Sequence, residues 1–341
     1  MWGEILSWSA FGATITVQNA AFDDVFGDRP EFASQLQAKI GGTTGIGGFL
    51  GHPLGILLST RGLVATAFWL PASMMAAQAA LFVLCSPETL PPSKRKPFRY
   101  ATANPIASIR MLFGNGPGLR RLALAACTYC SCTSTWSTME PFRADPRGLG
   151  WPASWQSAYN SACFLSSAVS QAFFIPWLIQ TLGNLGAFKR WSMVAGAAYF
   201  CVGQAGRPLG ASRLRKSVQY LVPAIVLQDP WTDPCSYPIR ALVVKEGIDL
   251  GIGGRGEVAA AYDGITDMVG CFMPLVWGWL FGFFSSPPSS GWLGRVAGVL
   301  GFGGHLALAA ALRISGGVIV STITGKMLAS AQDGEAPKKA S

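Results

Sequence analysis

The chain of 341 residues is 50% hydrophobic and only 13% charged, with 26 Lys and Arg against 17 Asp and Glu. Soluble domains carry about 25% charged residues, so this composition is typical of helices packed in a lipid bilayer. The net charge of +9 lies in short clusters between apolar runs. Such clusters follow from membrane topology and anionic headgroups, and they argue against a nucleic-acid partner.

The apolar runs predict an all-α, polytopic transmembrane helical bundle with about eight clear spans. Residues before Asp23 include too many polar side chains for a confident span, and the stretch from Asp23 to Lys39 is interpreted as an aqueous loop. The expected spans are Ile40–Leu58, Leu63–Cys85, Leu122–Phe142, Ala158–Leu182, Trp191–Ala205, Val218–Val244, Val258–Phe284 and Leu293–Leu312.

A basic connector with several prolines separates the second span from the third. It extends from Ser86 to Arg121 and holds seven of the 26 Lys and Arg. The positive-inside rule places such a loop in the cytosol. Alternation then puts Lys189 and Arg190 on the same side, whereas the cluster Arg207–Lys216 falls on the opposite side, against the rule.

The first span is dense in glycine. Gly47, Gly51 and Gly55 recur every four residues, which puts small residues on one helix stripe and allows another helix to come close in lipid. His52 lies between them, and an imidazole that titrates near neutral pH suits a proton-coupled gate. A packed, hydrogen-bonded core histidine is the alternative interpretation.

Four aspartates lie inside apolar runs, where an ionisable group is a functional-site hypothesis by default. Asp229 and Asp233 share one face if their segment stays helical, and they would then bind a proton or a cationic group of a solute. Alternatively, the proline after each one breaks the helix at a water-filled mouth. Asp263 and Asp267 repeat the spacing, and the deeper Asp267 needs either a partner or a raised pKa.

Gln156, Asn160 and Gln171 lie along one span and either line a polar path or form hydrogen bonds between helices. Cys127, Cys130 and Cys132 have no second cysteine pair or histidine to complete a metal site, so they are interpreted as small apolar residues. The glycines from 251 to 256 lack the strand that precedes a dinucleotide loop. No enzyme activity, metal or cofactor is therefore expected.

Three segments resemble the major facilitator superfamily, in the branch that holds tetracycline-resistance-like exporters. They are Gly47-x-x-x-Gly51-His52-Pro53-Leu54-Gly55, which resembles the fifth helix; Pro87–Leu90 with Asn104–Ala125, which resembles the end of the sixth and the start of the seventh; and Gly256–Pro274, which resembles the start of the eleventh. His52 stands where the family usually has proline. Helices one to three of the family have no counterpart, so an N-terminal truncation is expected.

The resemblance implies a helix bundle of two halves with a cavity between them. Residues 1–85 are then expected to be the remnant of the first half with helices four to six, 86–121 the connector, 122–325 the second six-helix half, and 326–341 a disordered tail. The resemblance also makes the five residues Gly47, Gly51, His52, Pro53 and Gly55 a candidate gating motif.

The function that this resemblance implies is secondary active transport of a small organic solute by alternating access, coupled to protons as in an antiporter. The expected solute or proton path comprises Asp229, Asp233, Asp263, Asp267, Gln156 and Asn160. The expected partners are the lipid bilayer, the solute, protons and a second copy of the chain. The alternative is an integral membrane protein that does not transport and acts as a helical scaffold.

Overall fold

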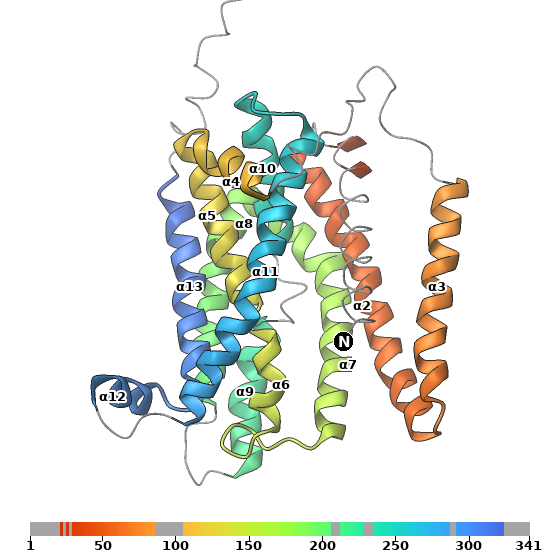
Figure 1. Cartoon of the computed structure of the whole chain (residues 1–341), viewed down its shortest axis with the longest axis vertical. Helices are drawn as coiled ribbons and strands as arrows, with labels where there is room; N and C mark the ends of the chain where they lie inside the picture. The colour runs from red at the N-terminus through yellow and green to blue at the C-terminus, as the bar shows by residue number, and fades with distance from the viewer. Residues whose placement is uncertain are drawn as a thin grey trace, which may run out of the picture.

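The computed structural model describes residues 21–22, 25–26, 29–85, 105–205, 212–227, 235–286 and 291–323, and every element in these ranges is helical. Figure 1 shows most of these helices running along one common axis. The helices are α2 (Pro30–Thr60), α3 (Val64–Cys85), α4 (Pro105–Gly114), α5 (Pro117–Thr133), α6 (Trp136–Ala144), α7 (Ala153–Val169), the π-helix η2 (Ser170–Phe174), α8 (Ile175–Gln204), α9 (Arg213–Leu227), α10 (Ser236–Asp249), α11 (Arg255–Ser285), α12 (Gly291–Leu300) and α13 (Gly304–Ser321).

Four stretches of helix are long and apolar enough to cross a bilayer. They are Val64–Cys85, Ala153–Gln204, Arg255–Ser285 and Gly304–Ser321. The second holds 52 residues and turns back on itself at Gly183, where φ is +67°. The expectation of an all-α transmembrane bundle is therefore confirmed.

The most extensive helix contacts in the bundle are those of α13 with α8, of α2 with α7, and of α13 with α5. Leu119 and Leu122 of α5 are fully buried with Ile239 of α10 and Val258 of α11 in one core cluster. A second cluster surrounds Trp277, whose indole N–H donates to the Ser131 carbonyl at 2.6 Å. Helices α5 to α13 thus form one packed unit, against which α2 is placed.

Helix α2 begins ten residues before the apolar run that predicted it. Pro30 occupies the first turn, where its missing N–H is not needed, and Glu31 follows where a negative charge favours a helix start. Ala33, Ser34 and Ala38 are buried. The expectation of an aqueous loop up to Lys39 is wrong, because this polar stretch has a small-residue face that packs against α8 and α10.

Glycines do bring α2 close to another helix, but they are not the predicted ones. A Cβ at Gly45 would lie 2.7 Å from the Ala168 amide nitrogen and 2.8 Å from the Phe164 carbonyl oxygen of α7. A Cβ at Gly47, Gly51 or Gly55 would meet no described atom within 4 Å. The close-packing stripe therefore lies nearer the start of α2, and the interpretation of Gly47, Gly51 and Gly55 as a helix contact is corrected.

One predicted span and the predicted connector have other bounds in the structure than the sequence indicated. The expected span Leu293–Leu312 is broken at Gly301, which has φ +69°, so that α12 ends at Leu300 and the spanning helix α13 begins at Gly304. In Figure 1, α12 lies beside the lower part of the bundle and projects away from it. The expected connector is also partly folded: α4 packs against α11, and α5 already begins at Pro117.

Helix α3 stands apart from the rest of the bundle at one edge of Figure 1. None of its 22 residues is buried, and its only substantial contact is with α2. A helix that is apolar on all sides and exposed on all sides is stable only in a lipid or protein environment.

The glycine packing of α2 predicts opposite outcomes for two matched substitutions. Gly45→Ala should lower the free energy of unfolding by about 1–3 kcal/mol, because the new methyl group meets backbone atoms that cannot yield. Gly51→Ala should be neutral or stabilise by up to about 1 kcal/mol, since alanine is the better helix former. Thermal unfolding of the detergent-solubilised variants measures both, and equal effects would contradict the packing described above.

Candidate functional site

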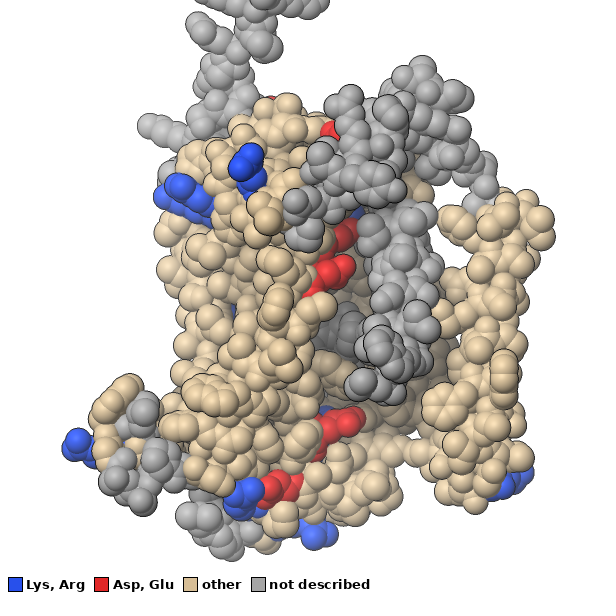
Figure 2. All heavy atoms as spheres, in the orientation of Figure 1, with Lys and Arg blue, Asp and Glu red and all other residues tan. Residues whose placement is uncertain are grey.

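One face of the bundle carries ionisable side chains between its two ends. Figure 2 shows acidic side chains in the middle of this face, whereas exposed Lys and Arg lie mainly near the two ends. An arrangement with its positive charges at the ends is that of a protein oriented in a bilayer. The polar residues of the face come from α6, α7, α10 and α11.

Asp263 of α11 forms an ion pair with Arg240 of α10. The Arg240 Nε donates to Oδ1 of Asp263 at 3.3 Å and its Nη2 donates to Oδ2 at 3.5 Å. The side chains are only 7% and 14% exposed. A guanidinium that meets a carboxylate through two nitrogens is held in a fixed orientation, and the pair ties α10 to α11.

Asp267 lies one turn further along α11, about 18 Å from the start of the helix. Its side chain is exposed, and no ion pair or hydrogen bond joins it to another described residue. Of the two expectations for Asp267, a partner is not found among the described residues, because its carboxylate stays open to the face. The raised pKa stays a prediction. It is the group on this face that is freest to take up a proton or a ligand.

Asn160 of α7 is joined to α6. Its Nδ2 donates to Oε1 of Glu140 at 3.3 Å, and Nη2 of Arg143 lies 3.9 Å from the same oxygen. The Arg143 guanidinium also lies over the ring of Tyr159, 4.8 Å from its centroid. Arg143 is 5% exposed, and its Nε has no hydrogen-bond partner among the described residues. A buried positive charge with spare donor capacity thus faces the same side as Asn160.

Gln171 contacts three helices at the π-helical turn η2. Its Nε2 lies 3.1 Å from the Ser167 hydroxyl, and its Oε1 accepts from the Tyr237 hydroxyl at 2.9 Å. A Cβ at Gly41 of α2 would collide with both Gln171 and Tyr237. This polar contact therefore lies where α2 meets α10, and π-helical turns are frequent at functional sites.

The remaining predicted residues have local roles or lie outside the described part. Nε2 of Gln156 donates to the Trp151 carbonyl at 3.2 Å, at the start of α7, rather than lining a path with Asn160. Nδ1 of His52 lies 3.1 Å from the Gly48 carbonyl, and its ring packs on Phe164 at 5.1 Å between centroids. Pro53 is inside α2. Asp229 and Asp233 lie outside the described residues.

Sequence reasoning missed Arg240, Arg143 and Tyr237. The signal was present for the two arginines, because each stands inside or at the end of an apolar run, where a charge is costly unless it is paired or functional. No pattern marks Tyr237, since a tyrosine in an apolar run is ordinary. Only the fold brings it to Gln171.

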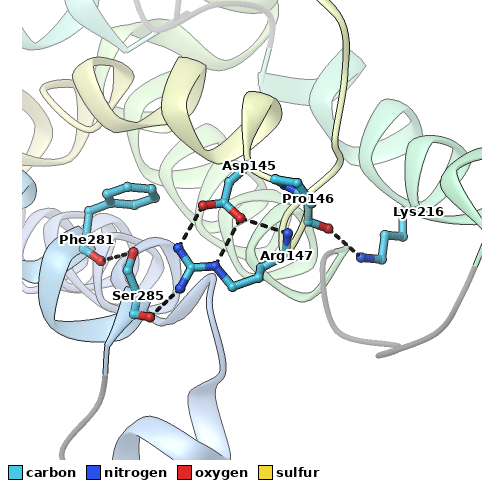
Figure 3. Close-up of polar contacts among 6 residues, drawn as sticks. All are labelled: Asp145, Pro146, Arg147, Lys216, Phe281 and Ser285. Atoms are coloured by element: carbon cyan, nitrogen blue, oxygen red, sulfur yellow. Dashed lines mark hydrogen bonds and ion pairs between the residues drawn. The ribbon is translucent and has the colours of Figure 1, made fainter.

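A second polar cluster lies where the loop after α6 meets α9 and α11, and Figure 3 shows it. Asp145 accepts from Nη2 of Arg147 at 2.8 Å and from its Nε at 3.0 Å, and Arg147 reaches the Ser285 carbonyl at the end of α11. Lys216 of α9 donates to the Pro146 carbonyl at 3.3 Å. The loop after α6 is thereby tied to both α9 and α11. Arg147 lowers the pKa of the Asp145 carboxyl below its usual range, chiefly by hydrogen bonding.

No family model matches the chain, and no curated protein does. Among solved structures, the chain is similar to the crystal structure of the human organic anion transporter MFSD10 (TETRAN), with a TM-score of 0.62 and 22% sequence identity. The match covers 90% of this chain and 67% of that one. The chain has a major facilitator fold. A likeness at this identity establishes the fold and leaves the branch of the superfamily and the solute to proposal.

The geometry of the Arg240–Asp263 pair predicts a cost for removing its carboxylate. Asp263→Asn should destabilise the protein by about 3 kcal/mol, because Arg240 stays buried without its counter-charge. Asp267→Asn, the same change one turn away at an exposed position, should alter the free energy of unfolding by less than about 0.5 kcal/mol. Melting curves of the purified variants measure both, and equal shifts would contradict this assignment.

The Asp145–Arg147 pair predicts a pH-dependent contribution to stability. Because the folded carboxyl has a depressed pKa, the pair contributes fully above the unfolded value of about 3.9, and its contribution is lost as the pH falls through the folded value. Asp145→Asn should therefore cost about 0.5–1 kcal/mol at pH 7. The difference from the unmodified chain should shrink below about pH 4. A constant difference in melting temperature from pH 7 to pH 3 would contradict this.

Proposed function

We propose that the chain is a secondary transporter that moves a small organic anion by alternating access, coupled to protons. The observation that carries the proposal is the polar face of the major facilitator fold, where the exposed carboxylate of Asp267 stands one turn from the Arg240–Asp263 pair. An exposed carboxylate at that depth is a natural site for a transported proton.

The charge that suits an anionic solute comes from Arg143. This guanidinium is 5% exposed, its Nε has no described partner, and Tyr159 packs on it. Guanidinium groups bind carboxylates and phosphates through paired N–H donors, and the aromatic ring beside it offers an apolar surface. The similar human protein is itself an organic anion transporter, which supports the same solute class here.

Alternating access requires two bodies that move against each other. Helix α2 meets α7, η2 and α10 along its first half, and the polar Gln171–Tyr237 contact lies in this junction. After Gly48, no described atom lies within 4 Å of a Cβ placed at Gly51 or Gly55 of α2. An interface that is closed at one end and open at the other fits a state in which the solute path opens to one side only.

A scaffold that does not transport is the second candidate, and α3 favours it. The helix is exposed along its whole length, with Phe68 at 76% and Trp69 at 74% exposed. Such a surface suits another membrane helix as well as it suits lipid. This function predicts no flux from well-folded protein.

Reconstituted vesicles test the two functions. We expect uptake of a labelled organic anion that a pH gradient accelerates and a protonophore abolishes. Asp267→Asn should lose the acceleration and keep gradient-independent exchange, because the amide cannot take up the proton. Asp249→Asn, the same change at the end of α10 and outside the proposed path, is the control and should keep the acceleration. Normal acceleration in Asp267→Asn would refute its role, and no flux with any solute would favour the scaffold.

A further inference from the structure

A separate cavity of about 620 Å³ lies at the end of the bundle where α2 begins, α8 turns at Gly183 and α10 ends. Its volume is in the range of sites that bind small molecules. The basic residues of the connector predict that this end faces the cytosol. The polar face described above uses none of the residues that line this cavity.

An unsatisfied acceptor lies in its wall. Asn184 is 4% exposed and lines the cavity, and its Oδ1 has no hydrogen-bond partner among the described residues. Gly183, with φ +67°, places Asn184 at the start of the second half of α8. A buried acceptor without a donor costs about 1–3 kcal/mol, so a ligand that brings a donor gains this energy on binding.

A buried carboxylate lies in the same wall. Glu246 of α10 is 4% exposed, lines the cavity, and forms no ion pair or hydrogen bond with the described residues. The neighbouring Lys245 is engaged elsewhere, since its Nζ lies 2.7 Å from Oδ2 of Asp249. Glu31 adds a second lining carboxylate, 3.2 Å from the Cβ position of Gly183. Two cations also line the cavity, Lys245 and the exposed Arg29, but Lys245 is paired with Asp249 and neither cation forms an ion pair with Glu246.

The rest of the lining is largely apolar. Phe32, Leu182, Leu185 and Leu242 line the cavity, and the exposed Arg29 lies at its rim, at the start of α2. A ligand that fits these walls has an apolar body and one donor-bearing positive group. Primary amines meet both conditions, because an ammonium has three donors for a carboxylate and an amide oxygen.

We propose that this cavity is a binding site for a lipophilic primary amine, whose ammonium group contacts Glu246 and the Oδ1 of Asn184 and whose apolar body packs on Leu182, Leu185 and Leu242. Because the cavity is lined by α2 together with α8 and α10, a bound amine joins these helices and stabilises the arrangement in which α2 contacts them.

Three probes with one apolar body test the proposal: 4-phenylbutylamine, 4-phenylbutanol and 4-phenylbutyrate. Binding to the purified full chain in lipid nanodiscs is measured by calorimetry, with empty nanodiscs subtracted. We expect saturable binding of the amine at least tenfold tighter than of the alcohol, and no saturable binding of the carboxylate. Because binding is measured without transport, the result is independent of the proposed function.

Two variants locate the site. Glu246→Gln should weaken amine binding at least tenfold, whereas Glu257→Gln, the same change at the start of α11 and outside the cavity lining, should not alter it. Leu242→Trp should abolish binding by filling the cavity. Equal binding of all three probes, preference for the carboxylate at Arg29, or unchanged amine affinity in Glu246→Gln or Leu242→Trp would each overturn the proposal.

Discussion

The close approach of α2 to the helices of the larger unit is the contact on which the described arrangement depends. At Gly45 the backbones of α2 and α7 are so close that a methyl group would meet the Ala168 nitrogen at 2.7 Å. In lipid, where apolar burial alone does not drive helices together, such contacts provide the packing energy of association. The Gln171–Tyr237 hydrogen bond and the amine-sized cavity both lie along this junction.

The polar face combines a satisfied ion pair with open groups. Arg240 and Asp263 neutralise each other at 3.3 Å, so that the charge that remains to act is on Asp267 and Arg143. A site that had to supply both charges from unpaired groups would be costly in lipid. Pairing most of the charges on this face lowers that cost, while the carboxylate of Asp267 stays exposed.

The fold class was predictable because apolar runs of span length and clustered basic residues report directly on the bilayer. Helix ends were predicted less well. Glycine at 301 ends α12 through a positive φ, which no hydropathy pattern shows, and the polar start of α2 is helical because its small residues are buried. Among the candidate site residues, Asp263, Asp267 and Asn160 lie on the polar face, and their role in a solute or proton path stays a prediction. Gln156 does not lie on this face, and Tyr237 could be placed only by tertiary contacts.

Helix α12 has a consequence for how the protein fits membranes of different thickness. It projects from the lower part of the bundle and presents Trp292 and Val299, each 67% exposed, beside the single cation Arg295. A short helix of this composition rests at the boundary between headgroups and acyl chains. Because α12 is joined to α13 by only three residues, tilting of the bundle to match a thinner bilayer would pull α12 out of that boundary or push it deeper. Local thickening of the surrounding lipid is therefore the easier response at this end.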